Sequence, residues 1–257
     1  MSKTVILITN DDGVRSPGIK ELQRALSVLG ETYVVAPDRE RSAAGHSLTI
    51  HRPLKVEEIA SRVFSVSGTP TDCVAIGVEK VLSARPDLIV SGINNGPNLG
   101  DDITYSGTVS AAIEGTILSI PSIAVSLAKK DGEELHYATA AGVAVRISAY
   151  VLENSLPYDT LLNVNVPNVP ADGLAGVRFT RQGKRIYKGA VKETFSPWGE
   201  KFFWIGGGKP YWEHGEDTDM NAVLEGYVSV TPIHLDLTNY AALDALKGWW
   251  ERWNSNT

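Results

Sequence analysis

Two adjacent carboxylates, Asp11 and Asp12, follow directly after an apolar run near the start of the chain. Ser42 and Asn94 also come soon after apolar runs, and Ser106 stands at the start of an expected helix. Hard divalent cations such as Mg²⁺ and Mn²⁺ prefer carboxylate, amide and hydroxyl oxygens. Two formal negative charges would leave a bound ion electrophilic enough to accept a phosphate oxygen as well. These residue types therefore predict a hard-cation site that also binds a phosphate group.

A phosphate site is also indicated by the turn that Ser106 begins. Ser106 is expected to cap the following helix, and Gly107 leaves free backbone amides at the helix amino end together with Thr108. Amides at that end of a helix favour bound phosphate. Zinc is disfavoured, because the single cysteine and the five histidines show no ligand spacing.

Strands and helices must alternate to bring these side chains together. Strands buried on both faces of a parallel sheet are predicted at 4–8, 32–36, 87–90 and 121–126. Helices are predicted after Ser16 and Thr69, which each precede a proline, after Ser106, and over 133–152. We expect a Rossmann-like α/β fold, with a doubly wound parallel sheet forming a core over residues 1–157. The polar clusters then meet at the carboxyl edge of the sheet, where ligands bind in such folds.

Residues 158–257 have a different sequence pattern, with short aromatic or β-branched runs separated by Gly-rich and charged segments. The run at 160–166 is expected to join the sheet, whereas those at 177–180, 201–205 and 227–231 are typical of antiparallel hairpins that project from the core. A segment at 52–67 is a further expected hairpin. The last helix, expected over 239–253, carries Tyr240, Leu243, Leu246, Trp249, Trp250 and Trp253. An aromatic and apolar helix surface of this kind is expected to be buried against another surface. A second subunit and the chain's own core are the alternatives, and we favour the subunit, which makes this region an extension used in oligomerisation.

Composition limits the partners. The 257 residues carry a formal net charge of -6, which argues against a surface that binds a nucleic-acid polymer through Lys and Arg. Cys73 is the only cysteine and lies in an apolar stretch, so we expect a buried, inert thiol. The first apolar run is too short for a signal peptide, and no run reaches transmembrane length. A cytoplasmic protein without a membrane partner is therefore expected.

Each of these residues also has a purely structural explanation. Asp and Gly are common in strand-to-helix turns, and Asn94, Asn95 and Asn98 can serve as turn formers. His46 is expected to hydrogen bond within its loop, with protonation of a leaving group as the alternative. What favours chemistry is repetition, because polar clusters follow several buried strands.

Five motifs, in order and spacing, closely resemble the SurE (survival protein E) family of metal-dependent 5'/3'-nucleotidases. They are TNDDG, APDRERSAAGHS, SGTPTDC, SGINNGPNLG and YSGTVSAAIEG, and RFTRQG and GYVSVTPI extend the similarity toward the carboxyl end. The resemblance implies hydrolysis of nucleoside 5'- and 3'-monophosphates, and it leaves activity on short polyphosphate open. It also implies a Rossmann-like core whose carboxyl-terminal elements are exchanged between the subunits of a homodimer or homotetramer.

Carried over residue by residue, the resemblance also assigns the site. The family's metal ligands fall on Asp11, Asp12, Ser42 and Asn94, and they imply one divalent ion per subunit, Mg²⁺ or Mn²⁺. Phosphate contacts are expected from Asn98, Ser106, Gly107 and Thr108. The chain departs from the family pattern at Asn95, where a basic residue often stands.

The reaction expected at such a site is in-line attack on phosphorus by a water held near or on the metal. Asp12 is expected to take the proton while Asp11 keeps the metal. The amides of Gly107 and Thr108 are expected to hold charge that develops on the equatorial oxygens. A covalent route through Ser42 or Ser106 stays open.

Two other classes of function compete with hydrolysis. A dinucleotide-binding oxidoreductase would carry G-x-G-x-x-G after the first strand, where this chain has two acids. A non-catalytic nucleotide-binding module would keep the crevice but release no phosphate. The D-x-D spacing of haloacid-dehalogenase-like phosphatases is absent.

Overall fold

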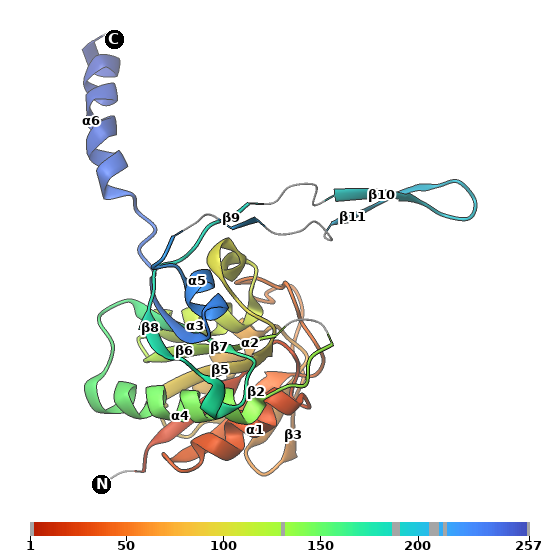
Figure 1. Cartoon of the computed structure of the whole chain (residues 1–257). Helices are drawn as coiled ribbons and strands as arrows, with labels where there is room; N and C mark the ends of the chain where they lie inside the picture. The colour runs from red at the N-terminus through yellow and green to blue at the C-terminus, as the bar shows by residue number, and fades with distance from the viewer. Residues whose placement is uncertain (1–2, 130–131, 187–190, 206–210, 213–214, 256–257) are drawn as a thin grey trace.

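A nine-stranded, mostly parallel sheet forms the centre of the computed structural model, which describes residues 3–129, 132–186, 191–205, 211–212 and 215–255 (Figure 1). The strand order is β3-β4-β2-β1-β5-β6-β7-β13-β8. In chain order the strands are β1 (Val5–Thr9), β2 (Glu31–Pro37), β3 (Val56–Ala60), β4 (Val63–Val66), β5 (Leu88–Asn95), β6 (Ser122–Ala128), β7 (Thr160–Pro167), β8 (Gly176–Phe179) and β13 (Tyr227–His234). Strands β4, β2, β1, β5, β6 and β7 run parallel.

Helices cover both faces of this sheet. Helices α1 (Pro17–Leu26) and α4 (Tyr137–Asn154) pack together on one face, in a cluster that includes Ile6 and Ile8 of β1. On the other face lie α2 (Pro70–Ile76), which continues as the π-helical turn η1 (Gly77–Val81), and α3 (Gly107–Ile117). Leu7 packs on that side, because successive strand residues point to opposite faces. The expected doubly wound α/β fold is confirmed.

The helix starts follow the expected signals, with one difference. Thr69 caps α2 in a capping box with Asp72, and Ser106 Oγ accepts a bond of 3.1 Å from the amide of Val109 in α3. Ser16 precedes α1 but makes no side-chain cap, since its Oγ instead accepts from Asn10 Nδ2 at 2.8 Å. Helix α1 ends at Leu26.

The carboxyl-terminal runs correct one expectation. β13 pairs antiparallel with β7 and parallel with β8, so the runs at 177–180 and 227–231 belong to the main sheet rather than to projecting hairpins. Val228 and Val230 of β13 are buried in the core cluster. The main sheet therefore continues past the expected boundary near residue 158. The β3–β4 hairpin within 52–67 is antiparallel, as expected.

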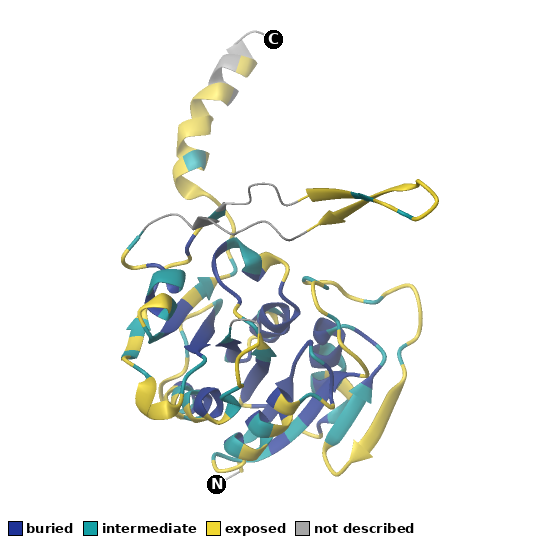
Figure 2. Cartoon of the chain, turned by 45° about the vertical axis from the view of Figure 1, so that its right-hand side comes forward, coloured by how far each residue is buried: buried dark blue, intermediate teal, exposed yellow. Residues whose placement is uncertain are grey.

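Two elements extend away from this body (Figures 1 and 2). One is an arm, in which β9 (Arg185–Ile186) pairs with β12 (Tyr211–Trp212) near the sheet, and β10 (Val191–Phe195) pairs with β11 (Lys201–Ile205) farther out. The other is helix α6 (Tyr240–Ser255), whose Trp249 is 64% exposed, so this tryptophan is not buried on the chain's own core. The side chain of Trp250 lies outside the described residues. None of the described helices combines the length and apolar character needed to cross a membrane.

Candidate active site

The predicted site residues meet where the sheet topology reverses. From β1 the chain passes through α1 to β2 on one side, and after α2 it returns to β5 on the other side. The loops after β1 and β5 therefore diverge and leave a crevice at the carboxyl edge. A cavity of about 310 Å³ lies there. Its lining residues are Asp11, Asp12, Glu40, Ser42, Ala43, Asn94, Asn95, Asn98, Asp102, Tyr105 and Ser106.

This cavity contains all four predicted metal ligands and two of the four predicted phosphate contacts, Asn98 and Ser106. The other two, Gly107 and Thr108, are not among the described residues that line it. Both contact Asp11 instead. The Thr108 hydroxyl donates to Asp11 Oδ1, and a Cβ on Gly107 would lie 2.8 Å from Asp11 Cβ. Their contact with phosphate stays a prediction.

Asp11 is the buried member of the carboxylate pair, with 5% of its surface exposed. Burial raises its pKa, and hydrogen bonds from the Thr108 hydroxyl and from the amides of Thr108 and Gly107 partly oppose that rise. The amino end of α3 is therefore packed against this carboxylate, which suits the positive end of the helix dipole.

Asp12 is half-buried and more loosely held. Its Oδ2 accepts one hydrogen bond of 3.1 Å from the amide of Asn95. Burial, followed by the charge of Asp11, raises the pKa of Asp12 to about 6. Two neighbouring carboxylates with raised pKa values repel each other and would be stabilised by a cation between them.

Asn94 reaches the cavity from a strand rather than from the expected loop, because β5 continues to Asn95. Its Nδ2 donates to the carbonyl of Gly96 at 2.8 Å. This bond orients the amide so that Oδ1 is its atom left for a ligand. The pairing of β5 with β6 shifts register between Ser91 and Asn94, which sets this end of the strand apart from the regular ladder.

Ser42 is carried by an exposed loop that is attached to the core at several points. Its Oγ donates to Glu40 Oε1 at 2.6 Å, and the amide of Arg41 donates to the carbonyl of Asp11 at 2.7 Å. His46 Nε2 lies 2.9 Å from Glu114 Oε2 in α3. His46 therefore bonds to a helix, not within its own loop as expected, and it is not among the described residues that line the cavity.

The predicted residue Asn98 is held by buried partners, Asn163 and Asn165, that were not singled out in the sequence. Asn98 donates its backbone amide to Asn165 Oδ1 and its Nδ2 to Ser126 Oγ, both at 2.8 Å. Its carbonyl accepts from Nδ2 of both Asn163 and Asn165 at 2.9 Å. The signal that could have found this pair is N-x-N inside the otherwise apolar run TLLNVNV, because buried amides need partners.

A second unpredicted residue, Asp219, joins the cavity wall to the arm. This carboxylate is fully buried and accepts amide bonds from Gly100 at 2.8 Å and Gly183 at 2.9 Å. Close by, the Arg185 guanidinium pairs with Asp102, which lines the cavity. The root of the arm is thus hydrogen bonded to the 3-10 turn η2 (Gly100–Thr104).

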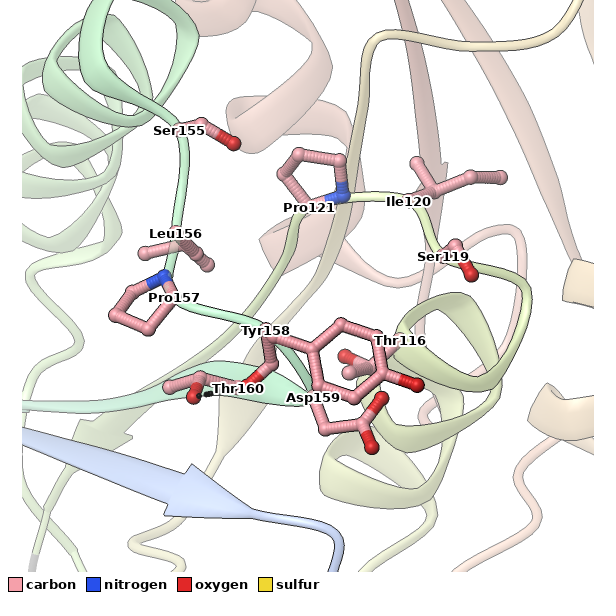
Figure 3. Close-up of a pocket in the computed structure, with 10 residues that line it drawn as sticks. All are labelled: Thr116, Ser119, Ile120, Pro121, Ser155, Leu156, Pro157, Tyr158, Asp159 and Thr160. Atoms are coloured by element: carbon pink, nitrogen blue, oxygen red, sulfur yellow. Dashed lines mark hydrogen bonds between the residues drawn. The ribbon is translucent and has the colours of Figure 1, made fainter.

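Two other hollows lie elsewhere. Figure 3 shows one of about 170 Å³ between segments 119–121 and 155–160, which precede β6 and β7 and so lie at the opposite edge of the sheet. The other, of about 500 Å³, is an apolar groove between α4 and the β7–β13–β8 end of the sheet. Neither is lined by a predicted site residue.

The candidate metal ligands of the cavity combine two charged carboxylates with a neutral hydroxyl and a neutral amide. Among the described residues, no group of three or more His, Cys, Asp or Glu side chains gathers as a metal site. A metal at the cavity would therefore take neutral oxygens from Ser42 and Asn94 besides the two aspartates. Cys73 lies apart, fully buried, and burial raises the pKa of its thiol, which confirms the expected buried thiol.

A doubly wound sheet with an oxygen-lined crevice at its switch point defines a Rossmann-like α/β protein built to bind a small ligand. The chain belongs to the survival protein SurE family, whose model matches residues 6–189. A protein named 5'-nucleotidase SurE from Geobacter sulfurreducens is 55% identical over 95% of this chain and 93% of its own length. The protein of that name from Geobacter metallireducens is also 55% identical, over 95% of this chain and 96% of its own.

The fold agrees with a solved structure of the same family. The crystal structure of the SurE protein from Aquifex aeolicus is 50% identical and superposes with a TM-score of 0.86, covering 95% of this chain and 99% of that one. The family resemblance seen in the motifs is therefore confirmed.

Proposed function

We propose that this chain is a divalent-metal-dependent phosphomonoesterase that hydrolyses nucleoside 5'- and 3'-monophosphates to nucleoside and phosphate. Relatives named 5'-nucleotidase SurE, 55% identical over nearly the whole chain, support this substrate class. The observation that carries the proposal is that Asp11, Asp12, Ser42 and Asn94 line one cavity together with the helix cap Ser106.

One divalent ion per subunit, Mg²⁺ or Mn²⁺, fits this donor set. All four candidate ligands offer oxygen, and a bound cation would offset the burial that raises the pKa of both Asp11 and Asp12 and the charge of Asp11 that raises the pKa of Asp12 further. When bound, such an ion supplies positive charge against the phosphoryl oxygens and makes a nearby water more acidic.

The two aspartates suit different roles. Asp11 is buried and held by Thr108, so it is the fixed ligand. Asp12 is more exposed, and the Asn95 amide is the donor that its carboxylate has among the described residues, so an oxygen of Asp12 is free to face the attacking water. Asp12 therefore takes a proton from the attacking water as the new oxygen–phosphorus bond forms. The ester bond breaks on the opposite side of phosphorus, and the leaving nucleoside oxygen takes a proton from solvent water.

The phosphate is held at the α3 side of the cavity. Ser106 Oγ already accepts from the amide of Val109, so its own hydrogen can point to a phosphoryl oxygen. Asn98 lines the same cavity, and its Nδ2 gives one hydrogen to Ser126 Oγ, which leaves the other for a phosphoryl oxygen. A phosphoryl-serine route through Ser42 or Ser106 is the alternative, and trapped phosphoenzyme would reveal it.

Release of phosphate from AMP tests this function directly. The protein is incubated with AMP or 3'-AMP and Mn²⁺, with and without EDTA, and free phosphate is measured. We expect metal-dependent release that Asp12→Asn lowers at least about 10²-fold. Short polyphosphate is tested as a further substrate, because a site that binds a terminal phosphoryl group can accept it. Binding of AMP without any release would instead favour a non-catalytic nucleotide-binding module.

Assembly as a homo-oligomer belongs to the same proposal. Large apolar side chains of the arm and α6, such as Trp204 and Trp249, are exposed, and a second subunit would cover them. Light scattering after gel filtration tests this, with Trp249→Glu expected to lower the mass toward that of one chain. A single-chain mass for the unaltered protein contradicts it.

A further inference from the structure

Tyr105 is the aromatic residue of the cavity lining, and its ring is largely uncovered. The residue is 63% exposed, although it lines a cavity whose other members are carboxylates, amides, serines and an alanine. Among the described residues, none is hydrogen bonded to its hydroxyl. A ring that contributes so little to packing is available to a ligand.

Backbone hydrogen bonds fix the position from which this ring projects. The amide of Tyr105 donates to the carbonyl of Asp102 at 3.0 Å, and its carbonyl accepts from the amide of Gly45 at 3.2 Å. Tyr105 thus lies between the turn η2 and the cap of α3, with the loop that carries Ser42 bonded to it. Such a residue loses little freedom when a ligand covers it.

Its position relative to the phosphate end of the site is also defined. Tyr105 directly precedes Ser106, whose hydroxyl faces the phosphoryl group in the proposed reaction. A nucleoside monophosphate held by its phosphate at Ser106 extends by one sugar before its base begins. An exposed ring beside the phosphate contact is therefore within reach of that base.

We propose that Tyr105 is the platform on which the base of the nucleoside monophosphate stacks. This rests on the proposed function and adds how the base is recognised. Every base has a π-face, so a single ring accepts purines and pyrimidines without reading their edges. The neighbouring carboxylate of Asp102 is ion-paired with Arg185.

The test compares a phosphate ester with a base to one without. The ratio of kcat/KM for AMP to kcat/KM for ribose 5-phosphate is measured for the unaltered protein, Tyr105→Phe and Tyr105→Leu. Loss of stacking is expected to lower the ratio about tenfold or more in Tyr105→Leu, while Tyr105→Phe keeps it within about twofold. Tyr158→Leu is the matched control, because Tyr158 is 84% exposed at the opposite edge of the sheet.

The outcomes separate the inference from the function. An unchanged ratio in Tyr105→Leu, or equal losses on both substrates, overturns the stacking role even if AMP is hydrolysed. If the unaltered protein releases phosphate from neither ester, the proposed function fails. Equilibrium dialysis of AMP then decides, since weaker binding to Tyr105→Leu supports the platform and equal binding overturns it. Should circular dichroism show that Tyr105→Leu is unfolded, Tyr105→Met takes its place in the same comparison.

Discussion

The hydroxyl of Thr108, near the start of α3, donates a hydrogen bond to Oδ1 of Asp11, just beyond the end of β1. The two residues are 97 positions apart in the chain. This bond fixes one oxygen of the buried carboxylate, and it also offsets part of the pKa rise that burial causes. Helix α3, which begins the proposed phosphate side of the site, thus also orients a carboxylate of the proposed metal side.

Removing this bond should weaken metal binding. Thr108→Val keeps the shape of the side chain but loses the donor, so the Asp11 carboxylate is no longer held in place for a cation and its pKa rises further. We expect Mn²⁺ affinity at pH 7 to fall about tenfold or more, measured by calorimetry. Thr116→Val is the control, since Thr116 is also buried in α3 but donates to Ala112. Equal effects of the two changes would contradict the role of Thr108.

Space at Gly107 gives a second prediction. A methyl group there would lie 2.8 Å from Asp11 Cβ and 2.9 Å from its Oδ2, so Gly107→Ala must displace the carboxylate or the helix. We expect destabilisation by about 1–3 kcal/mol and a large loss of phosphate release. Gly142→Ala in α4, where the methyl group meets nothing within 4 Å, should stabilise the fold by about 0.5–1 kcal/mol. Thermal unfolding measures both.

Asp12 should make the metal-free protein less stable as pH rises. Its pKa is about 6 in the fold against an ordinary 3.8, so between these values the unfolded chain ionises while the fold keeps the proton. In EDTA, the stability of Asp12→Asn relative to the unaltered protein should increase from pH 4 to about pH 6 and then stay constant. The total gain in the free energy of unfolding should be about 1–2 kcal/mol, because solvent screens a partly exposed group.

Saturating Mn²⁺ should reverse this order near pH 7, because only the unaltered protein keeps the full ligand set. Asp172→Asn, on an exposed 3-10 turn, is the control. A gap in the melting temperature between Asp12→Asn and the unaltered protein that stays constant from pH 4 to pH 7 would falsify the assigned shift.

The contact between His46 and Glu114 should hold the loop that carries Ser42. With His46→Ala, hydrogen exchange across 39–49 should become faster and Mn²⁺ affinity should fall several-fold, while the fold is kept. The loss is partial because Thr49 remains bonded to Asp72 farther along the loop. His51→Ala serves for comparison, because His51 is likewise exposed in the same polar region but makes no bond to α3 among the described residues. If exchange in 39–49 does not change, the contact has no such role.

Much of the fold was predictable because its signals are local. Adjacent acids after a buried strand located Asp11 and Asp12, and the cap signals located the starts of α2 and α3. The positions of β8 and β13 in the sheet could not be predicted, because short alternating runs do not indicate which strand they pair with. The expectation of projecting hairpins failed there for that reason.

The supporting shell of the site was harder to foresee. Asn165 accepts from Asn98, 67 positions away, and Asp219 accepts from Gly100, 119 positions away. A local pattern such as N-x-N can mark a buried amide, but it does not name its partner. Likewise, the motif that contains Gly107 and Thr108 predicts their proximity to the site but not their contact with Asp11.

Location of the ion tests the central claim most directly. Crystals grown with Mn²⁺ and a non-hydrolysable AMP analogue would reveal the ion by its anomalous scattering. The account predicts one peak per subunit, within coordination distance of oxygens from Asp11, Asp12, Ser42 and Asn94, with a phosphoryl oxygen completing the shell. A fully occupied Mn²⁺ elsewhere, or no peak in this cavity while the analogue is bound, would contradict it.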